Sequence, residues 1–330
     1  MRCGVVGAGA WGTALADLLA RGGYEVRLWA RERDVVESIN ATHENARFLA
    51  GYILDRSLEA YTDVHDVVGD SSIVLFAPPS FGLRQLARET KRSIAADALV
   101  IVATKGIEGD SLALMNEAVE DETGSHRVVA LSGPSFALEV IARQPTAVVV
   151  AAREAADAVA AQRLFAGDTF RTYTHDDVTG VELGGALKNV MAVATGIADG
   201  LRLGNNARAA LITRGLAEMT RLGVARGAKA RTFAGLAGLG DLVLTCTGAL
   251  SRNRSLGVEI GEGRTLDEAL AGKETVAEGV TTTRSARALA ARAGVEMPIV
   301  EAVNSVLFEA VPPRDAIAAL MARELRGEDD

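Results

Sequence analysis

Short apolar runs alternate with amphipathic helical patterns through the first half of the chain. Apolar residues recur at helical spacing between these runs, over residues 13–20, 33–40, 81–94 and 111–120. This alternation predicts an α/β domain with a mostly parallel, doubly wound sheet of the Rossmann type. The runs expected to form its strands are 2–6, 25–30, 72–77, 98–103, 127–131, 146–151 and 169–174.

Strand patterns nearly disappear after about Thr179, and Ala/Leu-rich helical patterns separated by glycines continue to the end. We therefore expect two domains, a sheet domain over 1–179 and an all-helical domain over 180–330. Thr265 with Glu268 has capping-box spacing, Pro312 and Pro313 suit a helix start, and 327–330 is expected to fray. The expected helices are 182–197, 206–226, 241–246, 252–260, 266–270, 281–293, 299–308 and 314–325.

A glycine motif follows the first apolar run directly, at Gly7, Gly9 and Gly12, with Ala10 and Trp11 inside it. Between a strand and a helix, the first glycine allows a tight turn. The second admits a pyrophosphate and the third lets helix and strand pack closely. The helix N–H groups then face an anion, so the motif predicts a dinucleotide site. The competing interpretation is a glycine-rich turn without a ligand.

Composition narrows the protein classes. The 330-residue chain has a formal net charge of −8, which argues against a general nucleic-acid binder. Its two cysteines, Cys3 and Cys246, imply no disulfide framework, and a reducing cytoplasm fits best. Charged residues interrupt every run before the roughly 18 apolar residues of a membrane span. The first residues superficially resemble a signal peptide, but the Rossmann interpretation explains all three glycines.

The end of the second expected strand indicates which nucleotide binds. An acidic residue at this position usually holds the ribose hydroxyls of NAD. Here Arg31 and Arg33 flank Glu32, and two guanidinium groups suit a 2′-phosphate. NADP(H) is therefore favoured, while Glu32 keeps NAD possible. The alternative is that both arginines belong to a solvated loop.

Lysine is rare in this chain: only five of the 35 Lys and Arg residues are Lys. A buried lysine can lose its proton, whereas arginine stays charged, so a proton-transfer site needs lysine. Lys188 lies among small, apolar residues in an expected helix. Burial there lowers the pKa of its ammonium, so Lys188 is the candidate acid/base. Lys105 follows the fourth expected strand, at the sheet edge where ligands collect. The alternative for Lys188 is a side chain that snorkels to solvent.

Further polar groups follow strand or helix ends. Gly133 and Ser135 come after the fifth expected strand, and Asp241 could orient a substrate hydroxyl or the Lys188 ammonium. The stretch from Ser251 through Asn253 opens a helix and offers hydroxyl, guanidinium and amide groups for a phosphate, although alone it is also an ordinary capped helix. The four histidines lie in polar contexts, and no Cys/His or carboxylate spacing suggests a metal.

Seven segments occur in the same order as in a known family: GAGAWGTALA, ATKGIE, LSGPSFALE, VELGGALKNVMAVATGIADG, GLAGLGDLVLTCTG, SRNR and VAEGVTTT. The chain thereby resembles the bacterial NAD(P)-dependent glycerol-3-phosphate dehydrogenases. The resemblance implies reversible reduction of dihydroxyacetone phosphate to sn-glycerol 3-phosphate for phospholipid synthesis. It also implies a helical C-terminal domain like that of 6-phosphogluconate dehydrogenase, and a homodimer.

The resemblance implies a role for each matching residue. Lys188 corresponds to the catalytic acid/base. The implied substrate contacts are Lys105, Gly133, Ser135, Lys188, Asp241, Ser251, Arg252 and Asn253. The implied cofactor contacts are Trp11, Arg31, Arg33, Phe48, Lys105, Ala137, Arg252, Val276 and Glu278.

Two positions depart from the family pattern, because Ala50 and Asp55 stand where proline is common. Two other functions stay open at this stage. One is a dehydrogenase of the same architecture that acts on a hydroxy acid or sugar acid, whose substrate would carry a carboxylate. The other is a non-catalytic NADP(H) sensor, for which Lys188 would be unnecessary.

Overall fold

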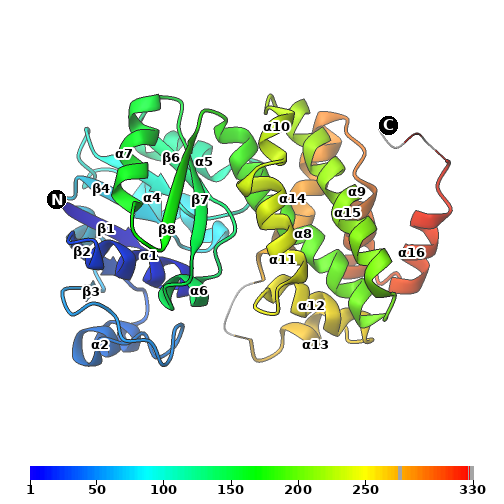
Figure 1. The fold of residues 1–330 in the computed structure, drawn as a ribbon, viewed down its shortest axis with the longest axis horizontal. Helices are drawn as coiled ribbons and strands as arrows, with labels where there is room; N and C mark the ends of the chain where they lie inside the picture. Colours follow the sequence, from blue (N-terminus) through cyan, green and yellow to red (C-terminus); the bar gives the residue numbers. More distant parts are fainter. Residues whose placement is uncertain (274–276, 326, 328–330) are drawn as a thin grey trace.

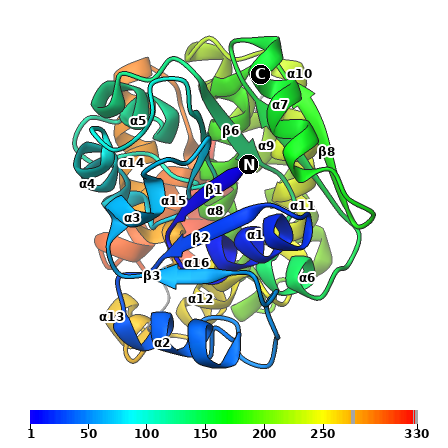
Figure 2. The same cartoon turned by 90° about the vertical axis from the view of Figure 1, so that its left-hand side faces the viewer.

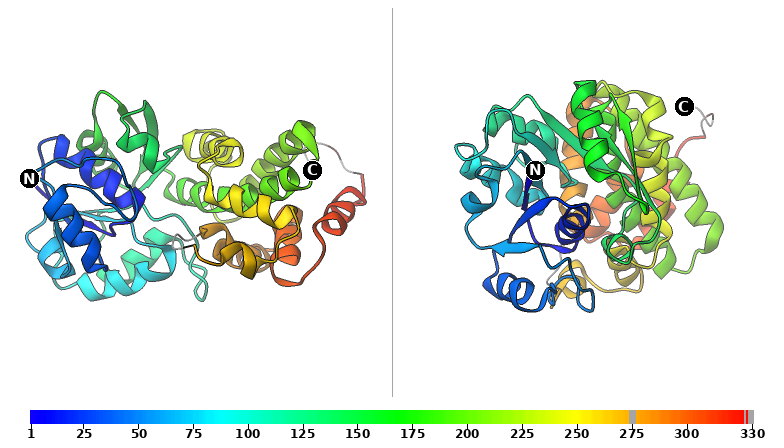
Figure 3. Two further views of the ribbon diagram at one scale, coloured as in Figure 1. Left: turned by 90° about the horizontal axis from the view of Figure 1, so that it is seen from below. Right: turned by 60° about the vertical axis from the view of Figure 1, so that its left-hand side comes forward.

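The structure is a computed structural model that describes residues 1–273, 277–325 and 327. It has two lobes, a sheet with its surrounding helices and a bundle of helices (Figure 1). The left view in Figure 3 shows both lobes from below. The last strand ends at His175 and the first helix of the bundle begins at Val178. The expected Val276 and most of the expected frayed tail lie outside the described residues.

Eight strands form one sheet in the order β3-β2-β1-β4-β5-β6-β7-β8. Neighbouring strands pair in parallel except β6 and β7, which are antiparallel, so β7 and β8 both run opposite to the other six strands. The order reverses between β1 and β4, and ligands of such sheets bind outside the carboxyl ends at this point. The strands are β1 (Arg2–Val6), β2 (Glu25–Trp29), β3 (Glu59–Tyr61), β4 (Ile73–Phe76), β5 (Leu99–Val102), β6 (Val128–Ser132), β7 (Thr146–Ala151) and β8 (Phe170–His175).

Helices cover both faces of the sheet (Figure 2), with α1, α6 and α7 on one face and α3, α4 and α5 on the other. The central strands β4 and β5 are buried throughout, as expected for parallel strands between two helical layers. The helices of this lobe are α1 (Ala10–Arg21), α2 (Arg33–Thr42), α3 (Val64–Val68), α4 (Ser80–Thr90), α5 (Met115–Thr123), α6 (Ala137–Ile141) and α7 (Ala155–Phe165).

The bundle surrounds α8 (Val178–Gly200), which is buried on all sides from Gly180 to Ala198. Such a helix is apolar around its whole circumference and forms the core of its domain. Asp177 caps its first turn by accepting the backbone N–H of Gly180 at 2.9 Å. The other bundle elements are α9 (Gly204–Ala225), α10 (Ala230–Phe233), the π-helix η1 (Leu236–Gly240), α11 (Asp241–Thr247), α12 (Arg252–Gly261), α13 (Leu266–Leu270), α14 (Glu278–Ala293), α15 (Pro298–Phe308) and α16 (Pro313–Met321).

Glycines bring α8 and α12 into backbone contact. A Cβ added at Gly257 would lie 2.2 Å from the carbonyl oxygen of Val193 and 2.9 Å from the Cα of Gly196. A Cβ at Gly261 would likewise meet the Ile197 carbonyl oxygen at 2.4 Å. Only glycine therefore fits this seam, and the close approach fixes where the first turn of α12 lies relative to α8.

Buried glutamates cap helices that belong to distant segments. Glu182 of α8 accepts the backbone N–H of Asn116 at 2.8 Å at the start of α5, and Glu218 of α9 accepts that of Ile299 at 2.8 Å at the start of α15. Burial raises the pKa of Glu182 to about 8 and that of Glu218 to about 7. The residues preceding α5 and α15 are Leu114 and Met297, whose side chains cannot cap. The distant carboxyl groups therefore supply the missing acceptors.

The expected elements are found, with some differences. The Thr265 capping box and the α16 start at Pro313 are confirmed. The prediction missed β3, α3, α6, α7, α10 and η1, most of which span only three to five residues, too short for a clear periodic pattern. The expected helix 111–120 begins only at Met115, because residues 107 and 114 form an isolated β-bridge first. The helices expected to reach 94 and 325 end at Thr90 and Met321.

Among the described residues, no single helix is both long and apolar enough to span a membrane. One bent pair of helical segments, 230–247 and 252–261, has the length and composition of a membrane span, and nothing beyond length and composition supports this.

Candidate functional site

Two lysines and one aspartate from separate elements meet where the lobes join. Lys105 follows β5, Lys188 lies in α8, and Asp241 begins α11. The Lys188 Nζ donates to Asp241 Oδ1 at 2.5 Å, and the Lys105 Nζ donates to Asp241 Oδ2 at 2.6 Å. Lys105 also donates to the carbonyl oxygen of Gly133 at 3.0 Å. One carboxylate thus holds two ammonium groups at the carboxyl end of the sheet.

Lys188 is in a setting that favours proton exchange. Its side chain is only 10% exposed, so its ammonium does not snorkel to solvent. Burial lowers its pKa to about 8, and the Lys105 ammonium acts in the same direction, while Asp241 opposes both. The Lys188 Nζ also donates to Thr245 Oγ1 at 3.0 Å. A buried amine with this pKa can give or accept a proton near neutral pH.

Thr245 is a site residue that the sequence interpretation missed. It lies four residues after Asp241 on α11, and this spacing places both side chains on one helix face. Its hydroxyl donates to the Asp241 carbonyl oxygen at 2.7 Å and accepts from Lys188. The i, i+4 spacing from Asp241 is the signal that could have identified it.

A π-helical turn, η1, leads directly into Asp241. A Cβ at Gly184 of α8 would lie 2.4 Å from the carbonyl oxygen of Ala237, and one at Gly238 would lie 2.1 Å from that of Phe233. Glycines therefore let η1 lie directly against α8. π-helical turns are rare and occur often at functional sites. This one ends at Gly240, immediately before the carboxylate that pairs with both lysines.

The start of α12 brings three further predicted residues to the site. Arg252 is exposed and can meet a ligand. Ser251 is the buried N-cap of α12, whose hydroxyl oxygen accepts the Arg254 backbone N–H at 3.2 Å. Asn253 is buried; its amide donates to Asn189 Oδ1 at 2.9 Å and its Oδ1 accepts the Gly279 N–H at 2.9 Å. In this structure Ser251 caps α12, Asn253 joins α12 to α8 and α14, and Arg252 is the more accessible group.

The end of β6 supplies the remaining predicted substrate residues. Gly133 has φ +130°, a conformation that favours glycine, and its carbonyl oxygen accepts from Lys105. The Ser135 hydroxyl donates to the same carbonyl oxygen at 3.0 Å. Ala137, a predicted cofactor residue, begins α6 directly after this turn. Gly133 and Ser135 therefore join the lysine cluster through one backbone oxygen.

The glycine loop has the geometry expected of a dinucleotide cradle. Gly7 has φ +117°, and a Cβ at Gly12 would lie 1.9 Å from the Gly7 carbonyl oxygen. Gly9 precedes α1 and has no atom within 4 Å of an added Cβ, so open space remains in front of the helix N-terminus, which begins at Ala10. The indole N–H of Trp11 is buried without a hydrogen-bond partner in the described structure. These observations fit a phosphate-bearing ligand at this helix end.

The residues expected to choose between NADP and NAD follow β2. Arg31 is 76% exposed in its side chain and pairs with Glu32 at 2.7 Å, while Arg33 is exposed at the start of α2. Phe48 is partly buried, with the Arg47 guanidinium 5.5 Å from its ring centre. These side chains lie on the β2 side of the glycine loop, whereas the lysine cluster lies beyond β4 in the sheet.

Asn45 is a second residue that the sequence interpretation missed. It is fully buried, and its amide donates to the Ala8 carbonyl oxygen at 2.9 Å and to Thr13 at 2.8 Å, while its Oδ1 accepts the Phe48 N–H at 3.1 Å. It thereby ties the Phe48 loop to the glycine loop. No local pattern distinguishes such an asparagine from a turn residue.

Asp55, which stands where proline is common in the family, makes hydrogen bonds that stabilise its loop. Its backbone N–H donates to Asp17 Oδ1 at 2.6 Å, a bond that proline could not form. Its carboxylate accepts from the N–H and hydroxyl of Ser57, which lower the pKa of Asp55. The departure from proline therefore anchors this loop to α1. Nothing in the structure explains Ala50, which is exposed.

Glu278 begins α14 and reaches back to the sheet lobe, where it accepts hydrogen bonds from Ser80. Of the two predicted cofactor residues in this part of the chain, Val276 and Glu278, only Glu278 is among the described residues. Among the described residues, no group of three His, Cys, Asp or Glu side chains could hold a metal ion.

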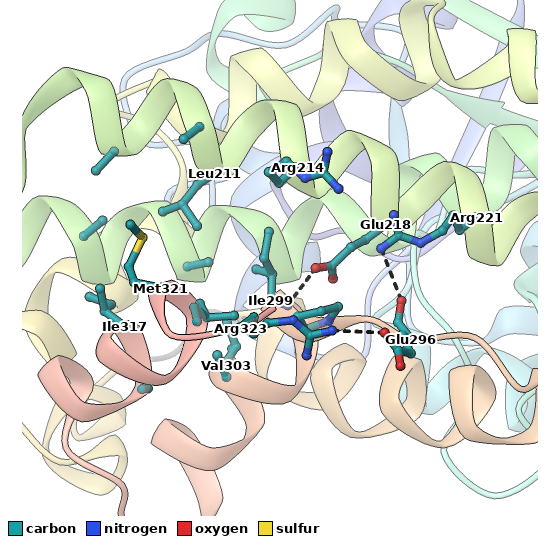
Figure 4. A pocket seen from close by; sticks show the side chains of 18 of the residues that line it. Leu211, Arg214, Glu218, Arg221, Glu296, Ile299, Val303, Ile317, Met321 and Arg323 are labelled. Atoms are coloured by element: carbon teal, nitrogen blue, oxygen red, sulfur yellow. Dashed lines mark hydrogen bonds and ion pairs between the residues drawn. The ribbon is translucent and has the colours of Figure 1, made fainter. Parts of the chain in front are cut away.

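A large apolar groove of about 1090 Å³ lies elsewhere, between α9, α15 and α16 (Figure 4). At one end Glu296 pairs with Arg323 at 3.0 Å, beside the buried Glu218. None of the predicted site residues lines this groove. Its apolar walls include Leu211, Ile299, Val303, Ile317, Leu320 and Met321.

Comparison with known proteins gives a consistent result over the whole chain. Residues 2–158 match the family described as NAD-dependent glycerol-3-phosphate dehydrogenase N-terminus, and residues 177–318 match its C-terminus. The chain is 51% identical to the glycerol-3-phosphate dehydrogenase [NAD(P)+] of Syntrophotalea carbinolica, with 100% of both chains covered. It is 50% identical to the enzyme of that name from Anaeromyxobacter dehalogenans, with 99% and 100% covered.

Solved structures agree with the sequence comparison. The crystal structure of glycerol-3-phosphate dehydrogenase from Coxiella burnetii has a TM-score of 0.94 at 43% identity, with 98% of this chain and 99% of that chain covered. The Saccharomyces cerevisiae glycerol-3-phosphate dehydrogenase has a TM-score of 0.83 at 27% identity, with 96% and 98% covered.

Proposed function

The chain belongs to the NAD-dependent glycerol-3-phosphate dehydrogenase family, and we propose that it interconverts dihydroxyacetone phosphate and sn-glycerol 3-phosphate. It is an NAD(P)-dependent oxidoreductase that acts on a CH–OH group. The observation that carries the proposal is the Asp241 carboxylate shared by the Lys188 and Lys105 ammonium groups. This cluster lies at the sheet edge that also carries the glycine loop.

The chain's own residues divide the chemistry among them. A bound nicotinamide nucleotide supplies or accepts the hydride. Lys188 gives a proton to the carbonyl oxygen at C2 as it becomes a hydroxyl, and takes it back in the reverse direction. Lys105 stabilises the negative charge that develops on that oxygen. Arg252, with the N-terminus of α12, binds the phosphate and thereby orients the ketone.

A substrate comparison tests this function. NADPH oxidation is measured with dihydroxyacetone phosphate, with unphosphorylated dihydroxyacetone, and with a panel of keto acids. We expect turnover with the phosphate ester and a much lower kcat/KM with dihydroxyacetone, because the phosphate binding energy is lost. Equal activity with both ketones would contradict the phosphate site, and a preference for keto acids would contradict the substrate class.

The pH dependence should report Lys188. Reduction needs its ammonium form, so kcat/KM for dihydroxyacetone phosphate should be level below about pH 7 and fall as the pH rises through about 8. Oxidation of glycerol 3-phosphate needs the neutral amine, so its kcat/KM should rise over the same range. Profiles that stay flat between about pH 7 and pH 9 in both directions would exclude a titrating Lys188.

We further propose that NADP(H) is preferred over NAD(H), with support from Arg31 and Arg33 beside the expected ribose position. Replacing Arg31 with alanine should raise KM for NADPH about tenfold and leave KM for NADH nearly unchanged, because only NADPH carries the 2′-phosphate. Steady-state kinetics with both nucleotides check this. Equal KM values for NADPH and NADH in the unmodified enzyme would contradict the proposed role of Arg31.

The remaining proposals concern organisation. We propose a nucleotide-binding domain over 1–179 and a substrate domain over 180–330, which is consistent with β8 ending at His175 and α8 beginning at Val178.

We also propose a cytoplasmic homodimer whose product enters phospholipid synthesis. Sedimentation equilibrium should give about twice the 34.4 kDa mass of one chain, and a monomer at micromolar concentration would contradict the dimer.

A further inference from the structure

A serine–glutamate contact joins the two lobes beside the site. Ser80 is the first residue of α4 in the sheet lobe, and Glu278 is the first residue of α14 in the helical lobe. The Ser80 hydroxyl donates to Glu278 Oε2 at 2.5 Å, and the Ser80 N–H donates to Oε1 at 3.3 Å. Both carboxylate oxygens are therefore engaged by a residue 198 positions away.

Glu278 supplies what α4 lacks locally. The residue before this helix is Pro79, which makes no side-chain cap. A carboxylate at a helix N-terminus accepts otherwise unpaired N–H groups and interacts favourably with the helix dipole. Glu182 and Glu218 cap α5 and α15 in the same way. Glu278 differs from them because it lies beside the lysine cluster and the start of α12.

The loop after β5, which carries Lys105, packs closely against Ser80. A Cβ at Gly106 would lie 2.7 Å from the Cβ of Ser80, and Gly106 directly follows Lys105. The Thr104 hydroxyl donates to the Pro78 carbonyl oxygen at 2.7 Å. The segment that carries Lys105 is thus fixed against the turn that carries Ser80.

From Glu278 the contacts continue to the substrate side. The next residue, Gly279, donates its N–H to Asn253 Oδ1, and the Asn253 amide donates to Asn189 Oδ1, each at 2.9 Å. Asn189 directly follows Lys188 on α8. Three side-chain hydrogen bonds and the peptide bond between Glu278 and Gly279 therefore connect Ser80 to the residue beside Lys188.

We propose that Ser80 is a positioning residue, which holds the Glu278 carboxylate in place across the lobe junction before the nucleotide binds. The inference rests on the proposed function and on Glu278 being the nucleotide contact that the family resemblance implies. With its carboxylate already ordered, the enzyme loses less conformational freedom on binding. Without the Ser80 hydroxyl, only the longer hydrogen bond from the Ser80 N–H remains, so Glu278 samples more rotamers and ordering it on binding weakens nucleotide affinity.

The test replaces Ser80 with alanine and titrates NADPH by its fluorescence, without substrate. We expect Kd for NADPH to rise about tenfold, as for loss of a hydrogen bond to a charged group, with kcat at saturation within about threefold of the unmodified enzyme. The matched control is Ser111→Ala, since Ser111 makes a local hydrogen bond to Glu108 within the sheet lobe. It should leave Kd unchanged. An unchanged Kd in Ser80→Ala, or an equal rise in both variants, would overturn the proposal.

A double-mutant cycle shows whether Ser80 acts through Glu278. Ser80→Ala should add no further loss of NADPH affinity in a Glu278→Ala background, whereas independent, additive losses would contradict the proposal. Thermal unfolding of each variant separates loss of affinity from loss of folded protein. Activity of the unmodified enzyme with dihydroxyacetone phosphate is scored separately. Its absence would overturn the proposed function, while the binding titration would still decide the role of Ser80.

Discussion

Replacing Lys188 with alanine should lower kcat for dihydroxyacetone phosphate reduction by about 10²–10⁴-fold, the range typical of losing a general acid. The Lys188 ammonium is buried and donates hydrogen bonds to Asp241 and Thr245. In the described structure, Lys105 is the only other lysine hydrogen-bonded to the Asp241 carboxylate. The measurement is NADPH oxidation at saturating substrate, beside an NADPH titration that confirms an intact nucleotide site.

Two further variants separate proton transfer from charge. Lys188→Arg keeps a positive charge that does not dissociate near neutral pH, so it should be nearly as impaired as the alanine variant. Lys229→Ala removes a lysine whose partner is the surface residue Asp176, and it should keep normal turnover. Near-normal turnover of either Lys188 variant would exclude the acid/base role.

Replacing Gly257 with alanine should lower the free energy of unfolding by about 1–3 kcal/mol, the usual cost of overpacking. The added Cβ would lie 2.2 Å from the Val193 carbonyl oxygen and 2.9 Å from the Gly196 Cα. Both are backbone atoms, so α8 and α12 must move apart. Because α12 carries Arg252, KM for dihydroxyacetone phosphate should rise as well. Urea denaturation and steady-state kinetics measure the two effects.

Gly82 provides the matched control, because it also lies within a helix but has no atom within 4 Å of an added Cβ. Gly82→Ala should therefore be neutral or stabilise the protein by up to about 1 kcal/mol, through the better helix propensity of alanine. Equal unfolding midpoints for Gly257→Ala and the unmodified protein would show that the seam tolerates a methyl group.

The main architecture could be predicted because its determinants are local. Fully apolar runs such as β4 and β5 have the composition of central parallel strands, and the glycine motif marks the turn into α1. Strand direction at β7 could not be predicted, because a strand buried on both faces has the same apolar pattern in either orientation. β3 was missed because three residues, of which only Ala60 is buried, show no periodicity.

The site was only partly predictable for a related reason. Lys105 and Lys188 were identifiable because lysine is rare and its proton dissociates more readily than that of arginine. Asp241 was expected as a partner of Lys188, and the structure confirms that pair. That the same carboxylate also binds Lys105 could not be predicted, because it depends on how glycines let the η1 turn pack against α8 in the folded protein. Asn45 and Ser80 act through long-range contacts to Ala8 and Glu278, for which a single sequence carries no local signal.

The most direct test is a crystal structure of the enzyme with NADP+ and glycerol 3-phosphate. We expect the Lys188 Nζ within about 2.6–3.2 Å of the C2 hydroxyl oxygen, or joined to it by one water, and the phosphate on Arg252 at the start of α12. A Lys188 side chain turned to solvent, with the C2 hydroxyl bonded to another titratable group, would contradict the assignment.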